Sequence, residues 1–309
     1  MHRLSATLHR QSGVVSRTQA VAAGLEDHDV RRLVRRRDLT PLLRGVYVDH
    51  TGEPTWQQRA WAAVLYAEPA ALTGTSALRA AGLRTGGSDP DDPVVIGIDH
   101  SRRVMPQPGV RILRSRGLEA RVQWNASPPR LRLESAVIEV ASAARRDLDA
   151  VALLIDTFQE RHTTQARLGV ALAQHPRIPR RRLLSDVIAG LDDGNGSVLE
   201  HGYLTKVERP HRLPRGQRQA LLANLPGRRD VLYAAARVLV ELDGREFHSL
   251  TRDRYADLER DAAAAAAGHL SIRLGWGQVF GTPCRTAELV GAVLTQQGWD
   301  GRAARCPRC

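Results

Sequence analysis

The chain has 309 residues, a formal net charge of +12 and an isoelectric point near 10.8. This length leaves room for two or three domains, and the excess of positive charge predicts attraction to polyanions. Three cysteines are too few for a disulfide framework, the N-terminus has no apolar signal core, and no apolar run reaches membrane-spanning length. We therefore expect a cytoplasmic protein with no membrane partner.

Composition favours double-stranded DNA as the polyanion. Lys206 is the only lysine, so nearly all of the 45 basic residues are arginines, whose planar guanidinium suits phosphate and guanine. Aromatic residues make up only 4% of the chain, which disfavours the stacking platforms that bind single strands. Non-specific attraction and binding of structured RNA are the alternatives.

The first 50 residues predict a small helical unit that ends in a strand, the pattern of a winged helix-turn-helix. Ser16 and Gln19 have the spacing of a capping box, and Gly24 is expected to end the helix that they begin. A second helix is expected to open near Asp27, and Leu42-Leu-Arg-Gly-Val-Tyr-Val48 is expected to form a strand. In a winged helix-turn-helix the second helix enters the major groove of DNA.

This second helix separates apolar from basic side chains. Val30, Leu33 and Val34 form its apolar face, and arginines occupy much of the remaining surface. An ordinary solvated helix with a basic face is the alternative. The arginines expected to contact DNA, from this helix and from the strand that follows, are Arg31, Arg32, Arg35, Arg36 and Arg44.

The middle of the chain predicts a mixed α+β region without catalytic residues, expected to serve as a spacer or a dimerisation surface. The elements expected there are helices over Trp56–Ala67 and Thr75–Ala81, strands over Val94–Ile98 and Val110–Arg114, and a helical stretch over 133–173. Glu134 and Glu139 have no evident partner in the sequence, so we expect them on the helix surface.

The last part of the chain predicts an α/β domain. Its elements follow the order helix, strand, strand, helix, strand, helix, which describes a mixed sheet flanked by helices. Cys306 and Cys309 have the spacing of half a zinc site, but the other two ligands are missing from the pattern, so we interpret them as part of a frayed tail. The expected divisions are 1–50, 51–190, 191–300 and a flexible tail over 301–309.

Three acids lie at the ends of two short apolar runs in this domain. Asp230 opens the first run, and Glu241 and Asp243 close the run that begins at Val238. Acids two residues apart on a strand point to one face, and charges that end a buried strand are costly unless a cation meets them. Together with His248 they predict a Mg²⁺ (or Mn²⁺) site able to cut a phosphodiester. A surface hairpin with solvated acids is the alternative.

A set of short motifs accompanies these acids between residues 197 and 296. The motifs are Leu199-Glu200, Asp230, Val240-Glu-Leu-Asp-Gly244, His248, Arg254 through Asp261, and the segment from Gly268 to Leu274. In this combination they resemble the PD-(D/E)xK nuclease superfamily, in the branch similar to very-short-patch-repair (Vsr-like) endonucleases. The resemblance implies a restriction-endonuclease-like α/β fold that hydrolyses DNA with Mg²⁺.

The resemblance also implies a role for each candidate catalytic residue. Asp230 would be the main metal ligand, Glu241 or Asp243 the second, and Glu200 would complete the site. His248 would act as a general base or stabilise the leaving oxygen. The superfamily's usual lysine lies two residues after the second acid, a place that Asp243 occupies here.

The front half carries a second resemblance. With Leu43-Arg-Gly-Val-Tyr47 as the wing strand and Leu72-Thr-Gly-Thr-Ser-Ala77 as the next helix, residues 5–173 resemble the winged-helix antitoxins of type IV toxin–antitoxin systems (AbiEi-like). The resemblance implies duplex DNA as a partner, and it allows a homodimer and a toxin or neighbouring-gene partner.

Together these patterns predict a DNA-binding, divalent-metal-dependent endonuclease that acts in defence or repair. The alternative is a non-catalytic, antitoxin-like transcriptional regulator with a degenerate nuclease fold, and the missing lysine motivates it.

Overall fold

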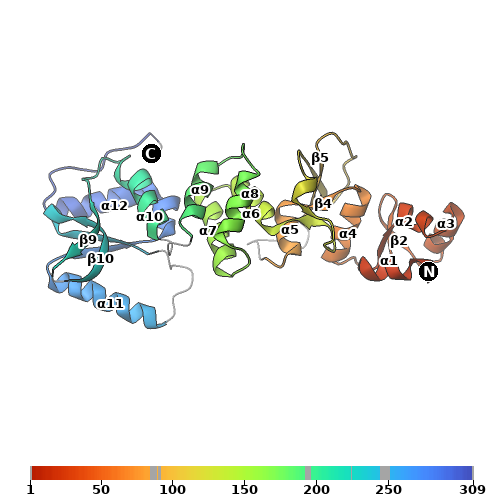
Figure 1. The fold of residues 1–309 in the computed structure, drawn as a ribbon, viewed down its shortest axis with the longest axis horizontal. Helices are drawn as coiled ribbons and strands as arrows, with labels where there is room; N and C mark the ends of the chain where they lie inside the picture. Colours follow the sequence, from red (N-terminus) through yellow and green to blue (C-terminus); the bar gives the residue numbers. More distant parts are fainter. Residues whose placement is uncertain are drawn as a thin grey trace. The chain divides into compact units, whose positions relative to one another are not determined.

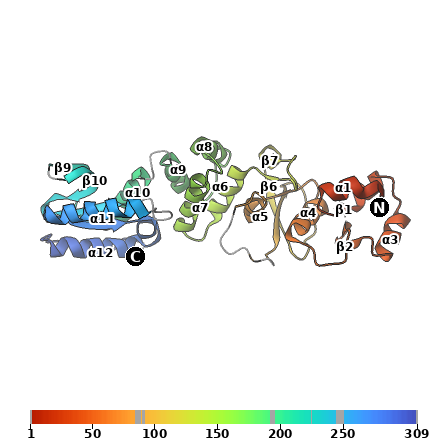
Figure 2. The ribbon, with the colours of Figure 1, turned by 90° about the horizontal axis from the view of Figure 1, so that it is seen from below.

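The computed structural model describes residues 2–83, 89, 92–191, 196–223, 225–243 and 251–307. They belong to two compact units, Met1–Val140 and Ala141–Cys309, coloured from red to yellow-green and from green to blue in Figures 1 and 2. Both units mix helices with sheets, which confirms the mixed α/β class at that level. None of the helices in the described ranges is both long and apolar enough to cross a membrane.

The first unit begins with a module of short helices around a three-stranded antiparallel sheet. Its helices are η1 (His2–Leu4), α1 (Ser5–Arg10), α2 (Arg17–Ala22) and α3 (Asp27–Arg35), and its strands are β1 (Val14–Ser16), β2 (Thr40–Leu43) and β3 (Val46–Val48). The strand order is β1-β3-β2, so β3 pairs with both of its neighbours.

Local sequence sets the ends of α2 and α3. The Ser16 hydroxyl accepts from the backbone N–H of Gln19, and the Gln19 side chain accepts from the N–H of Ser16, which confirms the predicted capping box. Gly24 then turns the chain with φ +82°, a conformation that favours glycine. The next helix, α3, begins at Asp27 as predicted.

The strand predicted over 42–48 is instead a hairpin. Gly45 takes φ +75°, and the turn at Arg44 and Gly45 separates β2 from β3. The run looks continuous in the sequence because Leu43 and Val46, on either side of the turn, are both apolar. As a result, Arg44 lies at the tip of a hairpin and not within a strand.

Packing fixes which face of α3 meets solvent. Val30 and Leu33 are 3% and 7% exposed and pack in one cluster with Leu4 and Leu39, and Val34 is half-buried against the same cluster. A helix that buries one stripe of its surface in this way turns the rest of its side chains to solvent. The predicted apolar face of this helix is therefore confirmed.

The rest of the first unit is built on a mixed five-stranded sheet in the order β6-β5-β4-β8-β7. Its strands are β4 (Ala71–Leu72), β5 (Val94–Asp99), β6 (Val110–Ser115), β7 (Val122–Gln123) and β8 (Arg130–Leu131), and its helices are α4 (Trp56–Tyr66), α5 (Gly74–Ala80), η2 (Glu119–Arg121) and α6 (Leu133–Ala143). The predicted helices and the two longer strands are confirmed. The other three strands have two residues each, too few to show a period in the sequence.

An ion pair in this unit shows that the surface position predicted for Glu139 is wrong. Arg121 Nη1 donates to Glu139 Oε1 at 2.9 Å, and the two side chains are 7% and 23% exposed. Thr73 Oγ1 donates to the other carboxylate oxygen at 2.6 Å. Glu134 is also buried. Both partners of Glu139 come from distant parts of the sequence, so no local pattern indicates them.

We expect Glu139→Gln to lower the free energy of unfolding by about 3 kcal/mol, because the variant leaves the buried Arg121 without its counter-charge. Urea-induced unfolding followed by circular dichroism measures the change. Asp38→Asn is the matched control, since Asp38 pairs with Arg36 at 3.5 Å on the surface of the same unit. It should change stability little. Equal losses in the two variants would contradict a special role for the buried pair.

The second unit opens with helices and continues into an α/β arrangement. The helices at its start are α7 (Asp147–Gln159), α8 (Gln165–Ala173) and α9 (Arg181–Ala189), of which the sequence predicted the first two as one helical stretch. The elements that follow are α10 (Gly196–Gly202), η3 (Tyr203–Glu208), β9 (Gln217–Leu222), β10 (Leu225–Tyr233), η4 (Ala234–Ala236), β11 (Val238–Leu242), α11 (Thr251–Ala266), β12 (Leu270–Leu274), η5 (Gly277–Gly281) and α12 (Pro283–Gln296).

A four-stranded mixed sheet in the order β12-β11-β10-β9 organises this part. The strands β9, β10 and β11 are antiparallel, whereas β11 and β12 run parallel. Ala264 of α11 packs against Leu232 and Leu239 on one face of the sheet, and Figure 1 shows α10 and α12 on the opposite side. The predicted order of elements is found, with β9 as an additional strand.

Candidate nucleic-acid interface and acidic cluster

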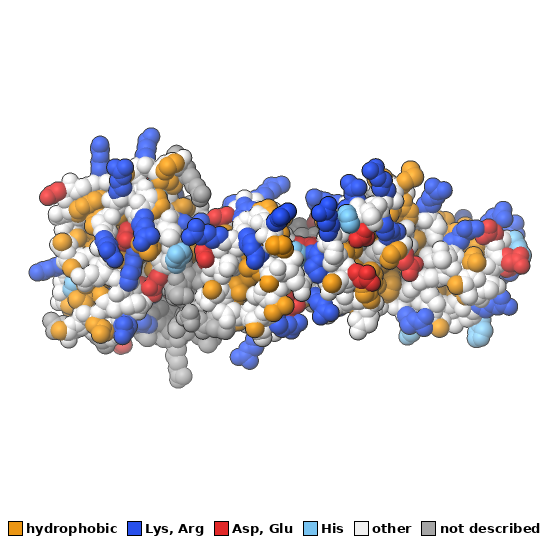
Figure 3. Space-filling view, turned by 45° about the horizontal axis from the view of Figure 1, so that its top comes forward, with side chains coloured by type: hydrophobic (Ala, Val, Ile, Leu, Met, Phe, Trp, Pro, Cys, Tyr) orange, Lys and Arg blue, Asp and Glu red, His pale blue; other side chains and the backbone are white. Residues whose placement is uncertain are grey.

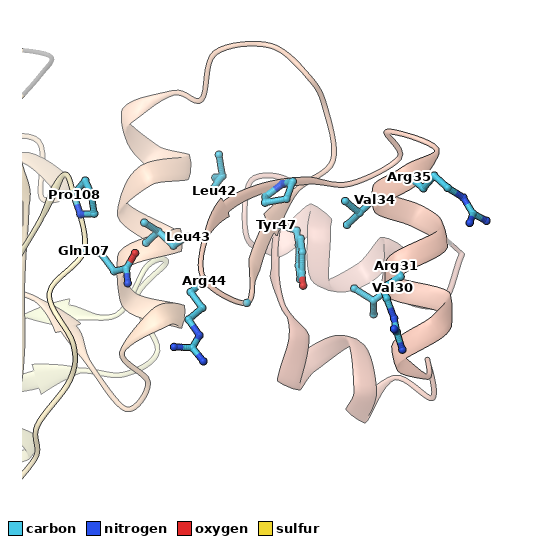
Figure 4. Close-up of a pocket in the computed structure, with 12 residues that line it drawn as sticks. Val30, Arg31, Val34, Arg35, Leu42, Leu43, Arg44, Tyr47, Gln107 and Pro108 are labelled. Atoms are coloured by element: carbon cyan, nitrogen blue, oxygen red, sulfur yellow. The ribbon is translucent and has the colours of Figure 1, made fainter.

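A groove of about 680 Å³ opens between α3 and the β2–β3 hairpin. Val30 and Val34 of α3, Leu43 of β2 and Tyr47 of β3 contribute apolar surface to its lining. Figure 4 shows Val30, Val34 and Tyr47 turned towards the space between the helix and the hairpin. The groove therefore combines an apolar interior with the basic residues that surround it.

Three arginines line this groove. Figure 4 shows Arg31 of α3 and Arg44 of the hairpin tip extending on the same side, while Arg35 points away from the groove. The Nε atom of Arg31 donates to the backbone carbonyl of Asp27 at 3.3 Å. Within the described part of the chain, the side chains of Arg35 and Arg44 make no hydrogen bond or ion pair. The groove thus presents cationic side chains that are not committed to a carboxylate.

The other two predicted DNA-contacting arginines are exposed but lie outside the groove lining. Arg32 pairs with Asp29 at 2.7 Å, and Arg36 pairs with Asp38 at 3.5 Å. The five arginines predicted as one set therefore divide into a groove-lining group and an ion-paired group.

A further arginine that was not predicted fixes the turn before α3. Both Nη2 and Nε of Arg17 donate to the Asp27 carboxylate, at 2.5 and 3.0 Å. The hydrogen bond from Arg17 lowers the pKa of Asp27. This contact joins the first residue of α2 to the first residue of α3, and so it helps set the angle at which α3 is presented.

Positive charge is not confined to this groove. On the face shown in Figure 3, Lys and Arg side chains extend from both units, with acidic side chains between them. Net charge alone therefore does not locate a binding surface, and the groove is distinguished by its shape and its uncommitted arginines.

The second candidate site is a group of acids in the second unit. Glu200 lies on α10, Asp230 in β10 and Glu241 in β11. The antiparallel register that pairs Val231 with Val240 places Asp230 beside Glu241. Asp230 precedes the apolar run that ends at Tyr233, but it lies inside the nine-residue strand β10, which begins at Leu225, so the prediction that it opens the strand is wrong.

Gln219 of β9 joins two of the acids. Its Nε2 atom donates to Glu200 Oε1, and it donates to Asp230 Oδ1 at 3.4 Å. The other oxygen of Asp230 accepts from the backbone N–H of Leu242 at 2.7 Å. The backbone of Gln219 has φ +50°, a strained conformation for a residue with a side chain, and such strain is common at functional sites.

Arginines compensate the acids at the other side of the cluster. Arg229 is 3% exposed, and its Nη1 atom lies 3.2 Å from Glu241 Oε1. Asp243 directly follows β11, and its carboxylate lies 4.0 Å from Arg273. The ion pair of Arg229 and the hydrogen bonds of Gln219 are not predicted from the sequence, because their partners come from other elements.

A buried network holds η3, which directly continues the helix that carries Glu200, against the strand that carries Asp230. Tyr203 and Tyr233 join their hydroxyls at 2.8 Å, and the Tyr233 hydroxyl donates to Glu208 at 3.0 Å. All three side chains are buried. The spacing between Glu200 and Asp230 is therefore fixed by core packing.

Three of the acids have raised pKa values. Burial is the main cause for Glu200, Asp230 and Glu241, since water no longer stabilises their charge. The negative charge of Asp230 raises the pKa of Glu200 and of Glu241 further. These carboxylates therefore repel one another, a repulsion that a bound cation would relieve.

The donor atoms of this cluster suit a hard divalent cation, because Mg²⁺ prefers carboxylate oxygens. However, no three of Glu200, Asp230, Glu241 and Asp243 bring their oxygens within 4.8 Å of one another in the structure. The cluster therefore has the oxygen donors that Mg²⁺ prefers, but these oxygens do not lie close enough together to surround an ion in this structure. His248, predicted beside it, lies outside the described residues.

We expect Glu200→Gln to raise the unfolding temperature near neutral pH. A raised pKa in the folded state means that the group's stability contribution is present below its ordinary pKa of 4.5 and is lost as the pH rises through the raised value. The amide removes this loss and can still accept a hydrogen bond from Gln219. Thermal unfolding at about pH 4 and about pH 7.5 measures the difference, which should be small at the lower pH.

The exposed Glu288 of α12 supplies the control for this experiment. Glu288→Gln removes the same charge outside the cluster and should not reproduce the pH-dependent gain. A gain of the same size in both variants would assign the effect to net charge.

Comparison with known proteins gives a family match at the N-terminus. The family model described as "Transcriptional regulator, AbiEi antitoxin" matches residues 2–48, which span η1 to β3. This confirms the AbiEi-like resemblance over that range, and no finding supports the Vsr-like resemblance of the C-terminal part. No curated protein matches the chain. The crystal structure of the RV2827C protein from Mycobacterium tuberculosis is similar at 22% identity and a TM-score of 0.37, over 63% of this chain and 76% of that one.

Proposed function

We propose that this protein is a DNA-binding regulator of the antitoxin kind, which contacts duplex DNA through α3 and the β2–β3 hairpin. The observation that carries the proposal is the coincidence of the AbiEi family match, residues 2–48, with the module that ends in this helix and hairpin. Helix α2, the turn at Gly24 and helix α3 would be the helix-turn-helix, and the hairpin would be its wing.

The dimensions and charge of the module suit this task. Helix α3 has nine residues, about 14 Å of helix, enough to lie in the major groove. Arg44 at the hairpin tip and Arg31 on α3 extend on the same side, so one duplex would meet both. Guanidinium groups without a protein carboxylate offer the full attraction to phosphate, because no ion pair has to be broken first.

We expect Arg31→Ala and Arg44→Ala each to weaken DNA binding roughly tenfold and to reduce the salt dependence of the binding constant by about one unit of slope per lost phosphate contact. Fluorescence anisotropy over a range of salt concentrations measures both quantities. The probes are a duplex from the region upstream of the protein's own gene and a duplex of the same composition with scrambled sequence. EDTA in the buffer keeps cleavage out of the measurement.

Arg146→Ala is the matched control for charge. Arg146 is 72% exposed and pairs with Asp149, and it belongs to the second unit, so its loss removes one positive charge from a different unit than the one that contains α3 and the hairpin. If this variant weakens binding as much as the groove variants do, attraction is non-specific and the proposal fails. Equal affinity for the two duplexes would remove the regulatory part of the proposal.

A second candidate function is metal-dependent cleavage of phosphodiester bonds by the second unit. The observation that favours it is the mutual repulsion of Glu200, Asp230 and Glu241 inside a buried cluster, next to a strained Gln219. Asp230 and Glu241 would hold Mg²⁺, which would neutralise charge on the scissile phosphate. Glu200 would complete the ligand set, and Asp243 and His248 keep the roles that the resemblance implies.

Nicking of supercoiled plasmid in the presence of Mg²⁺, Mn²⁺ or EDTA tests the second candidate. Metal-dependent nicking that is lost in Asp230→Asn and in His248→Ala, but kept in Glu288→Gln, is the expected result. An unchanged circular dichroism spectrum and an unchanged cooperative unfolding transition show that the Asp230→Asn protein is folded in the second unit, which carries the substitution. Nicking that persists in both variants would come from a contaminating nuclease and would count against the cluster.

A further inference from the structure

A histidine and two cysteines from three separate segments meet in the second unit. His211 follows η3, Cys284 is the second residue of α12, and Cys306 lies in the C-terminal segment. Their ligand atoms all lie within 4.8 Å of one another. Cys284 and Cys306 are half-buried thiols, not a disulfide, and their Sγ atoms are 3.6 Å apart.

The sulfur separation matches a tetrahedral metal centre. Two thiolates at the usual zinc–sulfur distance of about 2.3 Å stand about 3.8 Å apart at a tetrahedral angle. The 3.6 Å between Cys284 Sγ and Cys306 Sγ is close to this value, and it is far longer than the roughly 2.05 Å of a disulfide. The thiols are therefore already placed near the positions that a shared zinc ion would require.

The histidine has the orientation of a metal ligand. His211 is 1% exposed, and its Nδ1 atom donates to the backbone carbonyl of Val207 at 2.8 Å. This hydrogen bond places the ring proton on Nδ1, so Nε2 carries the lone pair. Ligating histidines commonly bond a backbone carbonyl in this way, because the bond fixes the tautomer and the ring orientation.

The surroundings favour thiolates and hold the segments together. Cys284 lies in the first turn of the 14-residue α12, where the helix dipole stabilises negative charge. The backbone N–H of Ala304 donates to the carbonyl of His211 at 2.8 Å, which brings the segment of Cys306 alongside the histidine. Residues near Cys306 are thus packed on the domain in the described structure, where the sequence predicted a frayed tail.

We propose that His211, Cys284 and Cys306 bind a structural zinc ion that fastens the C-terminal segment to the second unit. Two thiolates and one imidazole are a donor set that zinc prefers. Cys309 follows Cys306 with the CxxC spacing common at such sites, and it lies outside the described residues. This site is separate from the acidic cluster, whose oxygen donors suit a harder ion, and it does not depend on either proposed function.

Metal analysis of the full-length protein, purified in reducing buffer without chelator, tests the site. We expect about one zinc per chain in the parent protein and its loss in Cys284→Ser and Cys306→Ser. His201→Asn is the control, because His201 lies on α10 with its side chain half exposed, and this variant should keep its zinc. Zinc should also raise the unfolding temperature of the parent by roughly 5 °C or more over the EDTA-treated protein.

Cobalt substitution provides a readout that does not depend on the folding of a variant. The parent protein loaded with Co²⁺ should show a thiolate-to-cobalt charge-transfer band and the visible bands of tetrahedral Co²⁺. The proposal is overturned if the reduced parent takes up no zinc and shows no cobalt–thiolate band. It is equally overturned if both cysteine variants keep a full equivalent of zinc. The same holds if Cys284 and Cys306 are found as a disulfide and the protein binds no metal once this disulfide is reduced.

Discussion

Ionised side chains are costly to bury without a partner, and this constraint sets the position of the charged groups on which both proposed functions depend. In the first unit α3 buries its apolar stripe, so its arginines must face solvent. Arg121 is withdrawn from water in the same unit, and it keeps the Glu139 carboxylate at 2.9 Å. In the second unit the constraint acts on acids: Asp230 and Glu241 lose hydration, and Arg229 lies 3.2 Å from the second of them.

The ion pair between Arg229 and Glu241 is the reason to favour DNA binding over cleavage as the proposed function. A guanidinium that holds a Glu241 oxygen competes with any divalent cation for that oxygen, and Gln219 already occupies an oxygen of Glu200. Metal binding at these two oxygens would compete with both contacts. DNA binding at the groove meets no such competition, because Arg44 has no competing partner within the described residues.

Features set by local chemistry could be predicted from the sequence. The capping box of Ser16 and Gln19 and the apolar face of α3 depend on residues within a few positions of one another. The hairpin at Gly45 was missed because apolar residues flank the turn on both sides. Contacts made across strands left no pattern at all: Gln219 reaches the acids from β9, and His211 meets cysteines that come far later in the chain. The acids were found because carboxylates near apolar runs are conspicuous, whereas their partners are not.

Electrostatics also determines which surface of the protein can bind DNA when a chelator removes divalent cations. A phosphodiester brought to Glu200, Asp230 and Glu241 would add negative charge to carboxylates that already repel one another, as their raised pKa values indicate. Without a cation the three carboxylates disfavour a phosphate placed among them, although Arg229 offsets part of their charge. Binding measured in a chelator is therefore expected at other surfaces. Among the described surfaces, the groove of α3 and the hairpin has arginines without a carboxylate partner and lies within the range of the family match. The two proposed functions of the chain are separable for this physical reason: one needs a cation at the acids, and the other is complete without it.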